Sequence, residues 1–279
     1  MSTDAKTWFI TGVSRGFGKV LAEQLLADGA TVIGTTRDGT AQITPGRGSL
    51  TVLPLEITDP QAVRDTVARA FALGRVDVIV NNAGYGLLST VEEASEADIE
   101  HLFAVNFHGP RRIIQAALTH LRAQRSGHIV NITSIAGIAP AAGSGYYAAA
   151  KMAVEGLSQS LAREVAPLGI RVTLVEPGAF RTDFLSAHSI RQRNPALGDY
   201  APSAGAVHER LAAMAGRQPG DPARAAAAII AAVRAEQPPL HLVLGPDAYQ
   251  RTREVLEAFS AELDSWKTVS LGTDFPAGP

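Results

Sequence analysis

The sequence predicts an α/β fold: a parallel, doubly wound sheet of about seven strands with helices on both faces. Three observations support this prediction. Short apolar runs alternate with stretches of helical periodicity along most of the chain, as in parallel strands joined by crossover helices. The run VDVIVN at 76–81 is rich in valine and isoleucine, which is typical of a strand buried on both faces. The first apolar run, at 7–11, leads through a glycine-rich turn into the first helical stretch.

The predicted elements follow in order along the chain. The stretch 20–29 has apolar residues at helical spacing and ends in glycine. Asp59 and Pro60 form an N-cap and first-turn proline for the next helix. Ser95 and Asp98 resemble a capping pair at the start of a long helix. Seven segments have the composition of strands: 7–11, 31–35, 50–55, 76–81, 128–134, 171–177 and 241–245.

Three regions depart from this alternation. The loop at 39–48 is too poor in helix-forming residues for a helix. Residues 186–220 are rich in Pro, Gly and polar residues without a clear period, and we expect a substrate lid there. From 246 to 279 we expect a helical extension. We find no linker or internal repeat, so the sequence predicts a single domain over 1–279.

Composition excludes several classes of protein and site. The net charge of −2 gives no reason to expect a nucleic acid or a membrane surface as partner. The absence of cysteine excludes disulfides and thiolate chemistry, and no two of the seven histidines are four residues apart, so we expect no metal site. The longest apolar run, at 225–233, is too short to span a bilayer. With no signal-peptide pattern at the N-terminus, we expect a soluble, cytoplasmic protein.

The turn TGVSRGFG at 11–18 has the properties of a phosphate-binding loop. Gly12, Gly16 and Gly18 allow the backbone to turn tightly and approach a ligand. The helix that starts here offers free N–H groups and positive potential to a phosphate. Its glycine spacing differs from GxGxxG, and such a turn alone is weak evidence. Its place between the first strand and the first helix favours cofactor binding.

The stretch GSGYYAAAK at 143–151 places two tyrosines before a lysine. Only Tyr147 is four residues from Lys151, so only Tyr147 shares a helix face with it. A phenol at its reference pKa of about 10 is a poor acid or base at neutral pH, and a nearby positive charge improves it. We therefore predict that Tyr147 is the acid–base residue and that Tyr146 contributes to packing or to the pocket wall.

Five strings together resemble the short-chain dehydrogenase/reductase family. They are TGVSRGFG, NNAG at 81–84, Ser134, YAAAK at 147–151 and EPG at 176–178, in the order and spacing of that family over nearly the whole chain. The resemblance implies a Rossmann-type fold, a nicotinamide cofactor and hydride transfer to or from a carbonyl carbon. The catalytic residues it implies are Asn106, Ser134, Tyr147 and Lys151. Ser134 is expected to hold the substrate oxygen, Lys151 to bind the nicotinamide ribose, and Asn106 to hold a water that links Lys151 to solvent.

The same resemblance supplies a cofactor-binding set and a cofactor preference. Family members that prefer NAD have an aspartate where this chain has Thr36, followed by Arg37. Arg15 and Arg37 are suited to a 2′-phosphate, so we predict NADP, with NAD less favoured, although the carboxylate of Asp38 opposes this choice. Glu56 stands in place of the usual aspartate. The predicted cofactor-binding residues are Gly12, Ser14, Arg15, Gly16, Phe17, Gly18, Arg37, Glu56, Ile57, Asn82, Ala83, Gly84, Tyr147, Lys151, Pro177, Gly178 and Thr182.

Function is predicted as hydride transfer between NADP and a ketone or secondary alcohol. The alternatives are an epimerase-type use of the same site and a non-catalytic NADP-sensing regulator, which would not need the acid–base pair. Segments expected around the nicotinamide contain one obvious cation, Arg181, for which local binding near Asp183 is the alternative. The chain is most similar to the hydroxysteroid- and retinol-dehydrogenase-like branch and its bacterial relatives, which favours a lipophilic substrate. The apolar residues expected in the pocket are Leu87, Leu88, Ile138, Phe180, Phe184 and Leu185.

Two further expectations concern assembly and the lid. Leu256, Phe259, Leu263 and Trp266 recur at spacings of three and four, an apolar stripe that predicts packing within the chain or against another subunit. In the family the helix that carries Tyr147 packs against its copy, so we predict a homodimer or homotetramer. His188 and His208 are predicted to be solvated residues of the lid.

Overall fold

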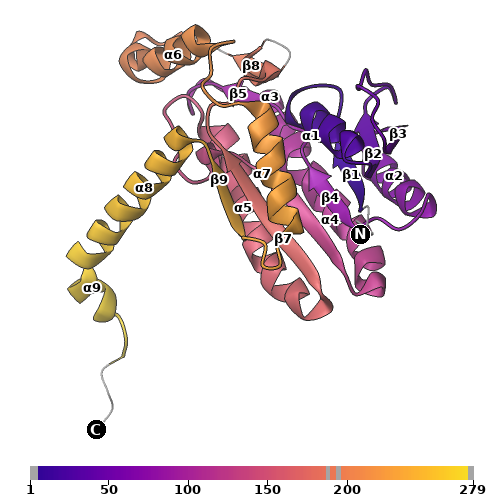
Figure 1. Cartoon of the computed structure of the whole chain (residues 1–279). Coiled ribbons are helices and arrows are strands. Elements are labelled where there is room, and N and C mark those ends of the chain that lie inside the picture. The colour runs from indigo at the N-terminus through magenta and orange to yellow at the C-terminus, as the bar shows by residue number, and fades with distance from the viewer. Residues whose placement is uncertain (1–5, 187–188, 193–195, 276–279) are drawn as a thin grey trace.

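The computed structural model describes residues 6–186, 189–192 and 196–275. Its centre is a sheet of seven parallel strands in the order β3-β2-β1-β4-β6-β7-β9. This is the predicted Rossmann-type α/β arrangement (Figure 1). The strands are β1 (Thr7–Thr11), β2 (Thr31–Thr36), β3 (Ser49–Pro54), β4 (Val78–Asn81), β6 (Gly127–Ile132), β7 (Ile170–Pro177) and β9 (His241–Leu244).

Helices cover both faces of this sheet. Successive residues of a strand point to opposite faces, so Phe9 packs into one core with α2, α4 and α5. Its neighbours Trp8 and Ile10 pack into the other core with α1 and α7. The helices are α1 (Gly16–Ala27), α2 (Pro60–Ala72), α4 (Gly109–Gln124), α5 (Gly145–Val165) and α7 (Pro222–Arg234).

The predicted helix starts are present. The side chain of Asp59 accepts hydrogen bonds from the backbone N–H groups of Gln61 and Ala62. Ser95 accepts from the N–H of Asp98 and begins α3 (Glu96–Phe103). Between α3 and α4 the chain forms one π-helical turn over Ala104–His108, which the sequence did not indicate. The loop at 39–48 contains no helix, as predicted.

The predicted lid region and several short helical turns complete the described fold. The predicted lid region contains more structure than its composition suggested: a short strand, β8 (Ile190–Gln192), which pairs with β5 (Gly86–Leu88), and α6 (Ala206–Met214). Some of its residues, His188 among them, are outside the described ranges. The short helical turns of the chain are Ile135–Gly137, Ala166–Leu168, Asp183–Leu185, Gly198–Tyr200 and Ala201–Gly205.

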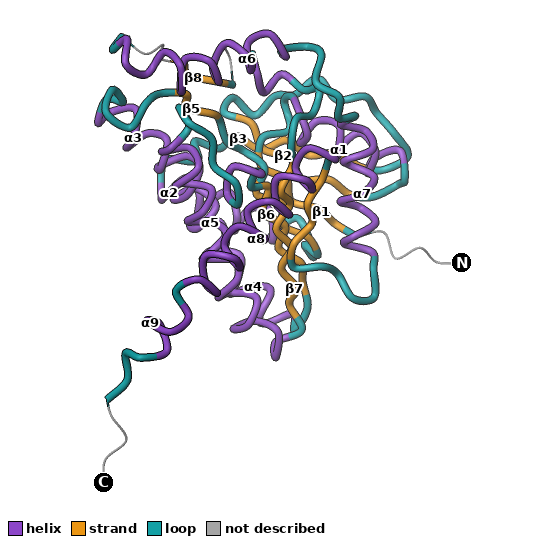
Figure 2. The backbone as a smooth tube through the Cα atoms, turned by 90° about the vertical axis from the view of Figure 1, so that its left-hand side faces the viewer, coloured by secondary structure: helices purple, strands orange, loops and turns teal. Residues whose placement is uncertain are grey.

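The C-terminal helices leave the body of the protein. Figure 1 shows α8 (Pro246–Ser265) and α9 (Lys267–Leu271) extending away from the sheet as an arm, and in Figure 2 α9 lies beyond the body of the protein. Ala248 is the one buried residue of α8. In the described part of the chain, no helix combines the length and the hydropathy that crossing a membrane requires.

Candidate active site

A cavity of about 1000 Å³ opens at the carboxyl ends of the strands. In a doubly wound sheet ligands bind at this edge, where the strand order reverses, here between β1 and β4. One part of the cavity is formed by the glycine turn after β1 and the loops after β2, β3 and β4. Another part is formed by the loops after β6 and β7 and by the lid region.

The glycine turn is shaped for the close approach of a ligand. Gly12 has φ +74°, a conformation that favours glycine. A Cβ atom on Gly18 would lie 2.2 Å from the Gly12 carbonyl oxygen, so no larger residue fits. The first turn of α1 has neither a side-chain cap nor an acidic residue, and its N–H groups remain suited to an anion. The turn fits the pyrophosphate of a nicotinamide cofactor.

Asn82 holds this turn in place. Its side-chain amide donates to the carbonyl oxygens of Thr11 and Gly12, both at 2.9 Å. The Thr11 hydroxyl in turn accepts from the backbone N–H groups of Asn82 and Ala83, both at 3.0 Å. These bonds join the loop after β4 to the glycine turn, so Asn82 organises the cavity through the backbone.

Most of the predicted site residues line the cavity. Gly18 and Asn106 do not: Gly18 is buried where the glycine turn enters α1, and Asn106 is buried behind the loop after β4. The predicted residues on the cavity wall are Gly12, Ser14, Arg15, Gly16, Phe17, Arg37, Glu56, Ile57, Asn82, Ala83, Gly84, Ser134, Tyr147, Lys151, Pro177, Gly178 and Thr182.

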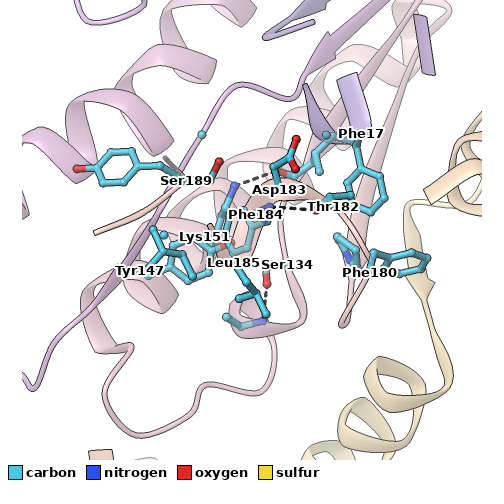
Figure 3. Close-up of a pocket in the computed structure, with 18 of the residues that line it drawn as sticks. Phe17, Ser134, Tyr147, Lys151, Phe180, Thr182, Asp183, Phe184, Leu185 and Ser189 are labelled. Atoms are coloured by element: carbon cyan, nitrogen blue, oxygen red, sulfur yellow. Dashed lines mark hydrogen bonds between the residues drawn. The ribbon is translucent and has the colours of Figure 1, made fainter. Parts of the chain in front are cut away.

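Ser134, Tyr147 and Lys151 come together at one side of the cavity (Figure 3). Tyr147 and Lys151 are both buried on α5, and the Lys151 Nζ atom donates to the Ile132 carbonyl oxygen at 3.0 Å. Burial raises the pKa of Tyr147 to about 12, and a hydrogen bond with Ser134 opposes this rise. Tyr147 is therefore protonated at neutral pH and can donate a proton.

Tyr146 occupies a different environment, in agreement with the helix-face argument. Its hydroxyl donates to the Val91 carbonyl oxygen at 3.1 Å, and its ring packs near Leu87 and Leu102. It does not line the cavity. Of the two roles predicted for it, the structure shows packing.

Asn106 lies in the π-helical turn and fastens the loop after β4. Its amide group donates to the Tyr85 carbonyl oxygen at 2.7 Å and accepts from the Tyr85 N–H at 3.1 Å. A Cβ on Gly84 would lie 3.1 Å from the Asn106 Oδ1 atom and 3.7 Å from the Lys151 Nζ atom. Asn106 thus lies beside Lys151, and its predicted role of holding a water stays a prediction.

Several expectations about the substrate side were wrong. Leu87 and Ile138 pack in small apolar clusters away from the cavity wall. Arg181 donates to the Gln218 carbonyl oxygen at 3.1 Å and not to Asp183. His208 is 2% exposed and its Nε2 lies 3.0 Å from the Gly143 carbonyl oxygen, so it is not solvated; this contact fastens α6 to the loop before α5.

Sequence reasoning also missed polar residues of the cavity wall. Asp247 accepts from the Ala179 N–H at 2.9 Å and joins the start of α8 to the loop after β7. Arg251 donates to the Ala139 carbonyl oxygen. Arg191 lies 5.1 Å above the Tyr85 ring and 3.6 Å from Asp98. These residues come from distant segments and carry no motif, although the sequence LGPDA after the last strand could have indicated Asp247 as a residue at a helix start.

Comparison with known proteins agrees with this geometry. The model of the family described as short chain dehydrogenase matches residues 6–193. Oxidoreductase BOA17 of Botryotinia fuckeliana is 36% identical, over 96% of this chain and 99% of the relative. The 3-ketodihydrosphingosine reductase of Bacteroides thetaiotaomicron is 36% identical, over 85% of this chain and 87% of the relative.

Solved structures show the same similarity. A short-chain dehydrogenase from Streptomyces avermitilis superposes with a TM-score of 0.89 at 41% identity, covering 98% of this chain and 100% of that protein. A metagenomic short-chain oxidoreductase in complex with NADP has a TM-score of 0.58 at 31% identity, covering 63% of this chain and 84% of that protein. The chain therefore belongs to the short-chain dehydrogenase/reductase family and is an NAD(P)-dependent oxidoreductase.

Proposed function

We propose that this enzyme transfers a hydride between NADP and a ketone or secondary alcohol, with Tyr147 as the general acid and base. The observation that carries the proposal is the convergence of Ser134, Tyr147 and Lys151 on the cavity that the glycine turn also lines. The nicotinamide cofactor, when bound, supplies or accepts the hydride at the substrate carbon. The protein then has to hold the carbonyl oxygen and move one proton.

Each side chain has a distinct part in that proton transfer. In this proposal Ser134, which lines the cavity with Tyr147 and forms a hydrogen bond with it, holds the substrate oxygen. In reduction the Tyr147 hydroxyl gives its proton to the oxygen of the substrate as the hydride reaches the carbon. The positive charge of Lys151 stabilises the phenolate that remains. In alcohol oxidation the same proton returns to Tyr147.

NADP preference is supported by the end of β2. Arg15 and Arg37 both line the cavity, and two guanidinium groups suit a 2′-phosphate. Asp38 points elsewhere: its Oδ1 atom accepts from the Thr36 hydroxyl at 3.0 Å and from the Thr40 N–H at 3.1 Å. These bonds keep the carboxylate in the loop after β2, and Asp38 does not line the cavity.

A lipophilic substrate is supported by the far part of the cavity. Its walls come largely from apolar side chains of the loop after β7 and of the lid region: Phe180, Phe184, Leu185, Ile190, Val207, Leu211 and Met214. Two arginines of the cavity wall already have polar partners within the protein. Arg191 pairs with Asp98, and Arg251 donates to the Ala139 carbonyl oxygen. The described part of residues 186–220 acts as the lid over the substrate in this proposal. The lipid-like substrate named for the Bacteroides relative agrees with it.

The direct test is a panel of ketones and alcohols assayed by nicotinamide absorbance. Bulky apolar ketones should give higher kcat/KM values than small polar ones, and NADPH should be preferred over NADH. Activity confined to sugars or carboxylated ketones would contradict the substrate class. NADPH binding without turnover of any panel compound would favour the sensor over the enzyme.

We also propose that the chain forms a homodimer or homotetramer through the α8–α9 arm. Leu256, Phe259, Leu263 and Trp266 are all more than half exposed, so no other part of the described chain covers them. Their spacing of three, four and three residues is that of a coiled-coil seam. We therefore propose that the arm of a second copy of the chain packs against this apolar stripe.

A further inference from the structure

Three titratable side chains that do not line the cavity gather where α5, β7 and β9 meet: Glu155, four residues after Lys151 on α5, Glu176 on β7 and His241 on β9. One carboxylate oxygen of each glutamate and one ring nitrogen of the histidine lie within 4.8 Å of one another. Glu155 is 5% exposed and Glu176 is fully buried, whereas the side chain of His241 is 43% exposed. We call these residues the acidic cluster. It runs from solvent to the interior beside the predicted active site.

Glu155 is the member of the acidic cluster that faces Lys151. The two residues are four apart on α5 and so share a helix face. Both pack over Gly137, where an added Cβ would lie 3.3 Å from the Lys151 Cβ atom and 3.2 Å from the Glu155 Cγ atom. Within the described residues, the ammonium group of Lys151 has one hydrogen bond, to the neutral carbonyl of Ile132. Glu155 is thus the nearby group that can balance its charge.

The carboxylate of Glu155 is poorly paired among the described residues: Thr133 lies close enough to lower its pKa, but without a hydrogen bond of normal geometry. Among the described residues, neither of its oxygen atoms is paired, and the Glu176 Oε2 atom is also unpaired. The nearby Thr133 hydroxyl donates to the Val175 carbonyl oxygen at 3.0 Å. Burying an unpaired charge is unfavourable by several kcal/mol. The negative charge of Glu155 is therefore stable only together with a positive charge.

A bound metal ion would be another way to stabilise these groups, but one distance argues against it. The His241 Nδ1 atom lies 2.6 Å from the Glu176 Oε1 atom and 3.9 Å from the Glu155 Oε2 atom. Two ligands about 2 Å from one tetrahedral ion lie roughly 3.3 Å apart. The shorter separation is that of a hydrogen-bonded pair, so the structure shows a charge cluster.

We propose that Glu155 is the counter-ion that keeps Lys151 positively charged, and that Glu176 and His241 control how much negative charge Glu155 carries. Glu155 is then a positioning residue: it touches neither substrate nor cofactor and acts through Lys151. The inference deepens the proposed function, because it rests on Lys151 supporting proton transfer by Tyr147. It gives the buried acidic cluster a role in setting the pH range of the enzyme.

The members of the acidic cluster act on Lys151 in two opposite directions: Glu155 and His241 favour its charged form, and Glu176 opposes it. Burial lowers the pKa of Lys151 to about 8, and Glu155 raises it. Burial raises the pKa of Glu155 to about 7; contact with Thr133 lowers it, the charge of Glu176 raises it, and His241 and Lys151 lower it. Burial also raises the pKa of Glu176, to about 8. Removing Glu155 should therefore make Lys151 lose its proton earlier, and removing Glu176 should do the opposite.

Titratable groups on the other elements around Lys151 and the acidic cluster do not change the direction of these effects on the pKa of Lys151. On α5, Lys151 itself is flanked by Tyr147 one turn earlier, whose own pKa lies well above this range. The turn Ile135–Gly137 carries no titratable group. From α8, the guanidinium of Arg251 is engaged by the Ala139 carbonyl oxygen and stays charged throughout.

The experiment compares the pH dependence of kcat/KM for ketone reduction in five variants, each with a side chain close in size to the one it replaces. Glu155→Gln should move the alkaline limb to lower pH by about one unit or more. Glu176→Gln should move it to higher pH, and His241→Asn should move it to lower pH by less than Glu155→Gln. Glu164→Gln, on an exposed part of the same helix, is the control and should leave the limb in place. Glu155→Asp, which keeps the charge, should restore part of the wild-type profile.

A second measurement does not depend on turnover. Because Lys151 lies next to Gly84 at the cavity wall, we expect NADPH affinity, followed by cofactor fluorescence, to show the same displaced alkaline limb in Glu155→Gln. If no ketone is reduced but this shift is present, the proposed reaction fails and the counter-ion role stands. The counter-ion role is wrong if Glu155→Gln and Glu176→Gln move the alkaline limb in the same direction in both measurements. It is also wrong if neither variant differs from Glu164→Gln.

Discussion

The ammonium nitrogen of Lys151 lies 5.8 Å from the centre of the Tyr147 ring, one turn further along α5. Both side chains are buried, so the attraction between the ammonium group and a phenolate is screened less than in water. A charge at this distance acts on the phenolate more than on the neutral phenol. The pair is therefore arranged to assist a proton transfer.

Replacing Tyr147 by phenylalanine removes the proton donor and keeps the ring. We expect Tyr147→Phe to lower kcat by about two to four orders of magnitude, while NADPH affinity stays near that of the wild type. Tyr146→Phe, which loses only the bond to the Val91 carbonyl oxygen, is the matched control and should remain active. Equal activity of the two variants would show that the proton comes from elsewhere.

Cofactor preference should depend on Arg37. In Arg37→Ala, a charge-assisted contact to the 2′-phosphate is lost, and kcat/KM for NADPH should fall by about tenfold or more. The value for NADH should change little. Arg47→Ala is the control, because Arg47 lies in the same loop but donates to the Ala27 carbonyl oxygen. A clear preference of the wild type for NADH would overturn the NADP assignment.

The close contact at Gly18 predicts that even one methyl group disrupts the glycine turn. A Cβ there would also lie 2.5 Å from the Asn82 Nδ2 atom, so we expect Gly18→Ala to weaken NADPH binding by at least about tenfold. Gly156→Ala is the control: no heavy atom lies within 4 Å of its added Cβ, and helix propensity predicts stabilisation by up to about 1 kcal/mol. Normal cofactor affinity in Gly18→Ala would argue against the turn as the phosphate site.

His128 should make the protein sensitive to acid. It is 5% exposed, and its Nε2 atom lies 2.9 Å from the Thr173 hydroxyl. Burial lowers the pKa of His128 to about 4, with Lys6 and Arg171 adding to the effect. Because the folded-state pKa lies below the unfolded one of about 6.5, its contribution is complete above that pH and is lost as the pH falls towards about 4.

The loss between pH 7 and pH 5 should be on the order of 2 kcal/mol in the free energy of unfolding. His128→Asn should be less stable than the wild type at pH 7 but should lose less stability on acidification. Urea unfolding at several pH values measures this difference. Identical slopes in wild type and His128→Asn would contradict it.

Assembly through the arm predicts a change of mass when the seam is made polar. Light scattering should find a species larger than the 29.2 kDa chain in the wild type and a smaller one after Leu256, Phe259 and Leu263 are each replaced by serine. Serine at Ala258 and Ala261, away from the seam, should leave the mass unchanged. A wild type that is monomeric at micromolar concentration would refute the proposal.

Much of the fold could be predicted because the signals are local. Strand composition, helix caps such as Asp59, and the Tyr147–Lys151 spacing each lie within a few residues of sequence. The errors arose where the environment is set by distant segments. His208 lies in a polar stretch of sequence and was predicted to be solvated, yet it is buried and its ring contacts the Gly143 carbonyl oxygen. The acidic cluster unites residues from α5, β7 and β9, so no spacing in the sequence could indicate it.

The pairing of β9 with β7 has a consequence for synthesis of the chain on the ribosome. β7 is almost wholly buried, and its carboxyl half, Leu174–Pro177, pairs with His241–Leu244, more than sixty residues later. Until that segment has emerged, β7 is an edge strand with unpaired peptide groups and a valine- and leucine-rich sequence, which is the usual starting point of aggregation. A nascent chain stalled before residue 241 should therefore be a client of the chaperones that meet it at the exit tunnel.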